Sequence, residues 1–317
     1  MAKKIKDAIF GLTVGDALGV PIEFTSREQL TKKPVKDMQA HGTFNQPKGS
    51  WSDDTSMTLA LMDSLANGLD YDDIMKKFIL WYKEGKYTPL SEAFGVGIST
   101  RQAINNYKEG AAALDSGGKD EYDNGNGSLM RTLPVVFYLR SKYGDYFEKE
   151  ENAFSIIHNI SALTHGHAQS KIACTIYVLV ANNLLNNENV EKSIEKSLST
   201  AVDYYQNYQE FSSEIKVFQR LLDPEFKKTK LKDIESSGYV VDTLEAGLWC
   251  LLNTDDYKTC VLKAVNLGRD TDTVAAIAGG LAGITYGYDS IPLKWRENII
   301  KKDFIESLCH KYYLSLN

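Results

Sequence analysis

Apolar residues recur every three or four positions along most of this chain, and this spacing constrains its fold more than any other feature. Ile5, Ile9 and Leu12 begin one such stripe, and residues 58–65 carry another. The spacing gathers apolar side chains on one face of an α-helix, whereas the strict alternation typical of β-strands is scarce. With 43% hydrophobic residues among 317, the chain can bury a sizeable core. The sequence therefore predicts an all-α protein, and residues 1–317 contain no linker or repeat that would divide them into domains.

The N-terminal segment carries glycines at helical spacing. Gly11, Gly15 and Gly19 fall at positions i, i+4 and i+8, so one face of a helix there is bare enough for another backbone to approach closely. Pro21 ends this helix and places Glu23 in the following loop. Taken alone, this pattern favours a tightly packed helix followed by a solvated glutamate over a functional site.

Two acidic clusters lie far apart in the sequence, each just before an apolar helical stretch. The first is Ser52-Asp53-Asp54-Thr55 and the second is Asp270-Thr271-Asp272-Thr273. Asp, Ser and Thr are preferred cap residues at helix starts, and acidic side chains in a first turn offset the helix dipole. A cap, however, needs one oxygen, and adjacent carboxylates repel each other unless a cation or a proton intervenes. Together the clusters predict an oxygen-rich site suited to Mg²⁺ or Mn²⁺.

Three further motifs have both a structural and a functional interpretation. The string Asp123–Arg131 alternates glycines with small polar residues, which makes either a plain turn or a cradle of backbone N–H groups for pyrophosphate. The string Thr164–His167 holds two histidines but no third soft ligand nearby, which favours a helix entry or a ligand-contacting histidine over a zinc site. Residues Asp242 to Glu245 have the pattern of a capping box that would begin a helix.

Charge and cysteine usage exclude several classes of protein. A net charge of −6 argues against a general nucleic-acid binder or a protein of anionic membrane surfaces. The apolar run 8–14 follows lysines as in a signal peptide, but Asp16 interrupts it, and no segment reaches the roughly 18 uncharged apolar residues of a membrane span. Scattered cysteines without a C-x-x-C pair argue against a disulfide framework or structural zinc and suit a reducing cytoplasm: Cys174, Cys250, Cys260 and Cys309.

In combination, these motifs resemble those of the ADP-ribosylglycohydrolase family, over nearly the whole chain. Residues 238–246 look closest to the dinitrogenase reductase-activating branch of that family. One departure is visible, because Gly166 follows His165 where the bacterial relatives often have a proline. The segments that carry the resemblance are Gly11–Glu23, Trp51–Thr55, Gly125–Arg131, Leu163–His165, Gly238–Trp249 and Asn266–Gly287.

The resemblance implies an orthogonal multi-helix bundle with two Mg²⁺ or Mn²⁺ ions at the bottom of a cleft. His165 would contact ADP-ribose and Tyr239 would lie against its adenine end. Glu23 would be a mobile glutamate near the metals, and Asp123 matches an acidic residue near the scissile bond. The phosphate and ribose path would be lined by Asn126, Gly127, Ser128 and Met130. The implied metal ligands are Ser52, Asp53, Asp54, Asp270, Asp272 and Thr273.

The implied activity is hydrolysis of the glycosidic bond between ADP-ribose and a modified protein side chain, with an arginine linkage favoured. Such cleavage passes through an oxocarbenium-like state, and Glu23, Asp54 and Asp123 are the candidate catalytic carboxylates. The expected partner is an ADP-ribosylated protein or a small ADP-ribose conjugate, bound by a cytoplasmic monomer. Three alternatives stay open: an ADP-ribose binder without catalysis, a hydrolase of serine, O-acetyl or nucleobase linkages, and a metal-dependent phosphoesterase.

Overall fold

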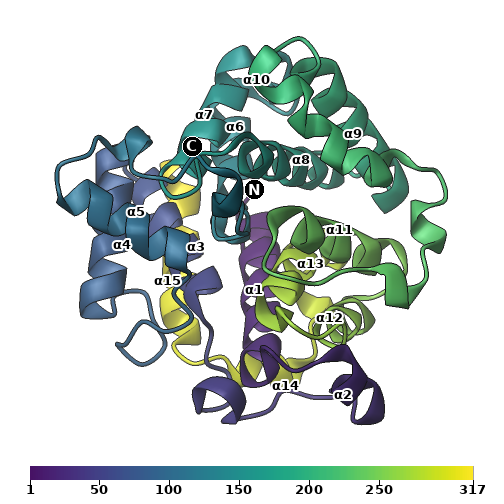
Figure 1. Ribbon diagram of the computed structural model, residues 1–317. Coiled ribbons are helices and arrows are strands. Elements are labelled where there is room, and N and C mark those ends of the chain that lie inside the picture. The colour runs from purple at the N-terminus through teal and green to yellow at the C-terminus, as the bar shows by residue number, and fades with distance from the viewer. Residues whose placement is uncertain (317) are drawn as a thin grey trace.

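Two helices from opposite ends of the chain lie side by side through the middle of the molecule. The structure, a computed structural model, describes residues 1–316. Helix α1 (Ala2–Gly19) contains the glycine-rich segment, and helix α13 (Thr271–Tyr286) follows the second acidic cluster. In Figure 1 the purple α1 runs alongside the yellow-green α13. Every residue of α1 from Asp7 to Gly19 is buried, and so are the first fourteen residues of α13.

Glycines allow the backbones of these two helices to touch. A Cβ atom added to Gly15 would lie 2.0 Å from the carbonyl oxygen of Ala275, and one added to Gly11 would lie 2.3 Å from that of Gly279. The contact is reciprocal, because a Cβ on Gly279 would lie 2.4 Å from the carbonyl oxygen of Gly11. No side chain fits in these gaps. The expected bare helix face is therefore present, and α13 is the element that packs on it.

The variant Gly15→Ala should be strongly destabilised. The added methyl group meets rigid backbone instead of a movable side chain, so the helices must separate, at a cost of about 3 kcal/mol of unfolding free energy. Gly97→Ala is the matched control, because Gly97 has a φ of −61° and its added Cβ would meet only Thr100 Oγ1, at 3.9 Å. Urea unfolding measures both variants. Equal losses in the two would contradict the backbone contact.

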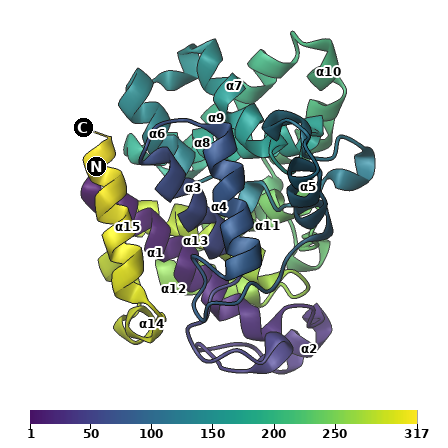
Figure 2. The same ribbon diagram turned by 90° about the vertical axis from the view of Figure 1, so that its left-hand side faces the viewer.

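Thirteen further α-helices surround this pair within residues 1–316, and Figure 2 shows α3 and α4 in front of it, with α15 along one side. No β-strand occurs in this range, only isolated bridges, so the all-α prediction is confirmed. The buried apolar side chains form a single core. No helix there has the length and apolar character needed to cross a bilayer.

The thirteen helices around α1 and α13 are α2 (Arg27–Lys32), α3 (Asp53–Leu65), α4 (Tyr71–Glu84), α5 (Ile98–Lys108), α6 (Pro134–Tyr143), α7 (Glu151–Ala162), α8 (Ala168–Leu185), α9 (Val190–Tyr205), α10 (Gln209–Ser212), α11 (Val240–Leu252), α12 (Tyr257–Val265), α14 (Leu293–Asn298) and α15 (Lys302–Ser315).

The capping box expected at residues 242–245 is wrong. Helix α11 begins earlier, at Val240, with Tyr239 as its cap residue and no side-chain cap hydrogen bond. Asp242 therefore lies inside the first turn of the helix. Glu245 forms an ion pair with Arg220 at 3.2 Å instead of reaching back to a backbone N–H. The local pattern assigned the Glu245 carboxylate to the helix cap, but this carboxylate is paired with Arg220 from a distant segment.

Candidate metal centre

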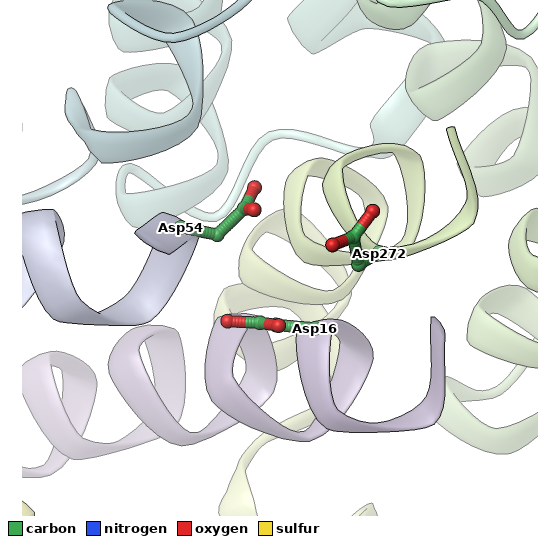
Figure 3. A group of neighbouring side chains, drawn as sticks. All are labelled: Asp16, Asp54 and Asp272. Carbon is green, nitrogen blue, oxygen red and sulfur yellow. The ribbon is translucent and has the colours of Figure 1, made fainter. Parts of the chain in front are cut away.

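Three aspartates from three different helices gather at one place. Asp16 lies on α1, Asp54 on α3 and Asp272 on α13, and each offers a carboxylate oxygen within 4.8 Å of the others. Figure 3 shows the three side chains where these helices meet. All three are buried, with exposed fractions of 0, 1 and 3%. Asp54 of the first acidic cluster and Asp272 of the second therefore lie close together, and α1 adds a third acid to them.

A second group adjoins the first. Glu23, Asp270 and Asp272 also offer oxygens within 4.8 Å of one another. Glu23 follows a short 3₁₀ helix (Val20–Ile22) at the end of α1, and Asp270 is the cap residue of α13. Because Asp272 belongs to both groups, the five acids form one continuous centre. No lysine or arginine within residues 1–316 forms an ion pair with any of them.

Asp16 holds the first turn of α3 in place. Its carboxylate accepts hydrogen bonds from the backbone N–H of Ser52 at 2.9 Å, from that of Thr55 at 3.0 Å, and from the Thr55 hydroxyl at 2.6 Å. Burial raises the pKa of Asp16 to about 6, although these donors oppose the shift. Sequence reasoning did not select Asp16. Its signal was the interruption of an otherwise apolar helix by a carboxylate, next to the glycine face.

The helix-capping alternative accounts for only one residue of the two clusters. Ser52 is the cap of α3, because its hydroxyl accepts the backbone N–H of Asp54 at 3.3 Å. Asp270 occupies the cap position of α13 but makes no side-chain cap hydrogen bond. The hydroxyls of Ser52 and Thr273 instead donate to Asp54 Oδ2, at 2.9 and 3.4 Å. Within residues 1–316, Asp54 and Asp270 therefore accept no backbone N–H at their helix starts, whereas Asp272 Oδ1 accepts that of Thr273 at 3.0 Å.

The electrostatics of the centre fit a bound cation. Asp54 Oδ1 and Glu23 Oε2 are buried and have no hydrogen-bond partner. Burial first, and repulsion between neighbouring carboxylates second, raise the pKa of Asp53, Asp54 and Asp272 well above the usual value for aspartate. The same two causes raise the pKa of Glu23 to about 8. Buried carboxylate oxygens without cationic partners are the donor set that hard divalent ions prefer.

Residues 94–100 form a wall of the centre that the sequence patterns did not indicate. A Cβ atom on Gly95 would lie 2.7 Å from Asp53 Oδ1, so the chain passes directly over that carboxylate. Gly95 has a φ of +75°, a conformation that favours glycine. At the other end of the segment, Thr100 Oγ1 would lie 2.9 Å from a Cβ on Gly127. The wall thus connects the first acidic cluster to the glycine-rich loop.

The glycine-rich loop is linked to the acidic centre by hydrogen bonds. Asn126 donates through its side chain to Asp270 Oδ2 at 2.7 Å, and through its backbone N–H to the carbonyl of Gly238 at 3.0 Å. The backbone N–H groups of Gly127 and Ser128 have no protein acceptor within residues 1–316. Gly127 is partly exposed, so its N–H is able to donate to an anionic ligand, whereas Ser128 is buried.

Two predicted ligand-binding residues of this loop have their side chains in the core. The Ser128 hydroxyl accepts a hydrogen bond from Ser161 Oγ at 3.0 Å and lies 3.4 Å from Cys174 Sγ. Met130 is 2% exposed and packs within the apolar core. Ser128 is itself 0% exposed, so both residues support the loop from within the core.

His165 and Tyr239 both lie against the glycine-rich loop. A Cβ atom on Gly127 would lie 2.8 Å from His165 Cε1, and burial, aided by Arg131, lowers the pKa of this histidine to about 3. Its imidazole is therefore neutral at physiological pH. Tyr239 forms an isolated bridge with Gly125, is 36% exposed, and donates its hydroxyl to Gln169 at 2.6 Å.

Asp123 and His167 have structural partners of their own. The Asp123 carboxylate accepts the backbone N–H of Asp120 at 3.1 Å and the hydroxyl of Ser99 at 3.4 Å, and it contacts none of the five acids of the centre. His167 is the cap of α8, since its Nδ1 accepts the backbone N–H of Gln169 at 3.3 Å. His167 therefore marks a helix entry, one of the two interpretations that the sequence left open.

Comparisons with known proteins agree over the full length of the chain. A family model described as ADP-ribosylglycohydrolase matches residues 1–316. The chain is 32% identical over 98% of its length to the ADP-ribosylarginine hydrolase Tri1 of Serratia proteamaculans (strain 568), of which it covers 79%. It is 31% identical over 93% of its length to the ADP-ribosyl-dinitrogen reductase glycohydrolase of Rhodospirillum rubrum, of which it covers 90%.

A solved structure described as an ADP-ribosylglycohydrolase-related protein complex has the same fold. Its TM-score is 0.79 at 28% sequence identity, and the match covers 100% of this chain and 99% of that one. Agreement in sequence and in fold leads to one conclusion: this chain belongs to the ADP-ribosylglycohydrolase family.

Proposed function

We propose that this protein is a metal-dependent hydrolase that cleaves the glycosidic bond between ADP-ribose and a modified arginine side chain. The observation that carries this proposal is the convergence of five acids without cationic partners beside a loop with two free backbone N–H groups. This combination suits a ligand that joins ribose hydroxyls to a pyrophosphate. Two relatives support the arginine linkage by their names. The Serratia relative is an ADP-ribosylarginine hydrolase, and the Rhodospirillum relative is an ADP-ribosyl-dinitrogen reductase glycohydrolase.

The residues present fit two divalent ions, Mg²⁺ or Mn²⁺. Four of the proposed ligands are aspartates, and their four negative charges would balance the four positive charges of such a pair. When bound, two such ions fix the ribose hydroxyls and lower the pKa of a water molecule. The proposed ligands are Ser52, Asp53, Asp54, Asp270, Asp272 and Thr273.

Other residues of the chain would bind and orient the substrate. The backbone N–H group of Gly127 would donate to the pyrophosphate, while Asn126 holds its loop against the acidic centre. The neutral His165 would contact the ribose and phosphate path, and Tyr239 would stack on the adenine. Hydrolysis also needs a carboxylate that exchanges a proton with the leaving group or with water. Glu23 is the favoured group, because its Oε2 atom is buried within the centre and has no partner.

Product analysis tests the proposed function. The protein is incubated with Mg²⁺ or Mn²⁺ and with ADP-ribose linked to arginine, to serine, to an acetyl group or to a nucleobase, and the products are identified by mass spectrometry. Free ADP-ribose from the arginine conjugate is the expected result. Release of inorganic phosphate would support a phosphoesterase instead, and binding of ADP-ribose without cleavage of any conjugate would support a binding protein.

Removal of the Tyr239 ring should weaken ADP-ribose binding. The variant Tyr239→Ala loses a stacking surface beside the loop, so calorimetry is expected to show a loss of about 1–3 kcal/mol of binding free energy. Tyr146→Ala is the matched control, because Tyr146 is an exposed tyrosine in a different part of the chain. If Tyr239→Ala binds ADP-ribose as tightly as this control does, Tyr239 has no role at the adenine.

We propose a cytoplasmic location and a monomeric state. All four cysteines are buried as free thiols, which suits a reducing compartment. The proposed partner is an ADP-ribosylated protein, or a small conjugate of ADP-ribose.

A further inference from the structure

Phe24 is held in an exposed position at the edge of the acidic centre. It directly follows Glu23, and its backbone N–H donates at 2.7 Å to the carbonyl of Arg269, the residue before Asp270. Its φ of 66° is a genuine outlier for a bulky side chain. The side chain is nevertheless 71% exposed. The backbone is thus fixed by the centre in a conformation that presents an aromatic ring to the surroundings.

Two more phenylalanines, Phe44 and Phe94, continue from Phe24, and both are half-buried. The ring centroids of Phe24 and Phe44 are 6.3 Å apart, and those of Phe44 and Phe94 are 5.2 Å apart. Phe94 begins the wall of residues 94–100, whose next residue covers Asp53. The three rings therefore connect the loop of Glu23 to the wall above the first acidic cluster.

Two further exposed apolar side chains lie beyond this wall. Ile98 is 78% exposed at the start of α5, and Tyr122 is 96% exposed. They belong to neighbouring segments, because the hydroxyl of Ser99 donates to the carboxylate of Asp123 at 3.4 Å. The same wall ends against Gly127 in the glycine-rich loop. Exposed apolar groups therefore follow one side of the site from Glu23 to the loop.

We propose that Phe24, Phe44, Phe94, Ile98 and Tyr122 form a docking rim for the folded protein that carries the modified arginine. This inference rests on the proposed hydrolase function and names its substrate class. ADP-ribose itself would be held by the glycine-rich loop, His165 and Tyr239, so a small conjugate has no use for the rim. Exposed apolar side chains gathered at the mouth of a site mark contact with a macromolecule. Any target whose modified side chain reaches the centre must place its surface over them.

The charges beside the rim indicate the chemistry of the docked segment. Glu92 lies two residues before Phe94, while Asp120 and Glu121 precede Tyr122 directly. All three acids are exposed and none has an ion pair in the described part of the chain. Of the two exposed cations in the same segments, Lys119 is paired with Asp115, and Arg101 has no ion pair there. Electrostatic complementarity then favours a target whose modified arginine is flanked by further basic residues.

The rim is tested by comparing one large and one small substrate. The probes are arginine-ADP-ribosylated histone, a basic folded protein, and ADP-ribosyl-arginine. In the variants Phe24→Ser, Ile98→Ser and Tyr122→Ser, the ratio of kcat/KM for the histone to kcat/KM for the small conjugate is expected to fall by about tenfold, as at interface hot spots. Tyr146→Ser and Leu314→Ser remove exposed apolar side chains elsewhere, 58% exposed in each case, and should keep the wild-type ratio.

The outcomes separate the docking rim from the proposed function. A ratio that stays within about twofold of wild type in all three rim variants, well below a hot-spot effect, would overturn the rim. An equal loss of kcat/KM on both substrates would also overturn the rim, because the side chains would then serve ADP-ribose binding or folding. Melting curves distinguish these two roles. Wild-type protein that releases ADP-ribose from neither substrate would overturn the hydrolase function itself, and the rim with it.

Discussion

Replacement of Asp272 by alanine is expected to abolish hydrolysis and to remove the stabilisation that divalent cations give to the wild-type protein. Asp272 is the acid shared by both carboxylate groups, and it is buried. Its loss would remove the carboxylate that both groups share. The wild-type protein should melt at a higher temperature with Mg²⁺ or Mn²⁺ than with EDTA, because an ion that binds only the folded state stabilises it. The variant should fold, and without metal it should be at least as stable, because one repelling charge is gone.

A matched acid distinguishes metal binding from helix capping. Asp70 is the cap of α4, and its carboxylate accepts the backbone N–H groups of Asp72 and Asp73 at 2.9 and 3.1 Å. Asp70→Ala should lose about 1 kcal/mol of stability both with EDTA and with excess Mg²⁺. If Asp272→Ala behaves in the same way, and wild type shows no metal-dependent change in melting temperature, the two-metal mechanism is wrong.

The same experiment should depend on pH in a defined direction. The folded protein without metal raises the pKa of Glu23 to about 8, whereas an unfolded glutamate titrates near pH 4. Between these values the folded state binds more protons than the unfolded state, so its stability falls as the pH rises through this window. Cations offset the ionised carboxylates, and the rise in melting temperature with Mg²⁺ should therefore be larger at about pH 8 than at about pH 6. A smaller rise at the higher pH would contradict this arrangement of acids.

The second large effect is expected at Asp16, which acts as a positioning residue. Both of its oxygens accept hydrogen bonds from Ser52 or Thr55, and these bonds orient the first turn of α3 with Asp54. Asp16→Asn replaces one acceptor oxygen by an NH₂ group that faces N–H donors. Loss of such outer support costs about 10–100-fold in metal affinity or activity, and the upper end is expected because Asp16 is fully buried.

A second buried aspartate on the same helix provides the control. Asp7 is 1% exposed, and its carboxylate accepts the backbone N–H of Tyr288 at 2.8 Å, far along α1 from the centre. Asp7→Asn should lower the melting temperature but leave the affinity for Mn²⁺ unchanged, as measured by calorimetry. Asp16→Asn should weaken Mn²⁺ binding. If both variants bind Mn²⁺ as wild type does, Asp16 serves folding alone.

The sequence also indicated one local feature that the fold overrode. The pattern at residues 242–245 fits a capping box, yet Glu245 is paired with Arg220 and α11 starts at Val240. Short polar motifs carry little energy, so a charged partner from a distant segment decides between their interpretations. The roles assigned to His165, Tyr239 and Asp123 by family resemblance stay predictions until the variants are measured.

The sequence by itself determined the helices and the chemical character of the site. Apolar spacing and oxygen-rich helix starts are local patterns, so Asp54 and Asp272 could be selected before any contact was known. Only the tertiary structure decided that Asp16 supports the first cluster and that residues 94–100 cover it. Neither has a local signature. Asp16 resembles any polar interruption of a helix, and the wall becomes part of the site only when the fold places Gly95 against Asp53 at the start of α3.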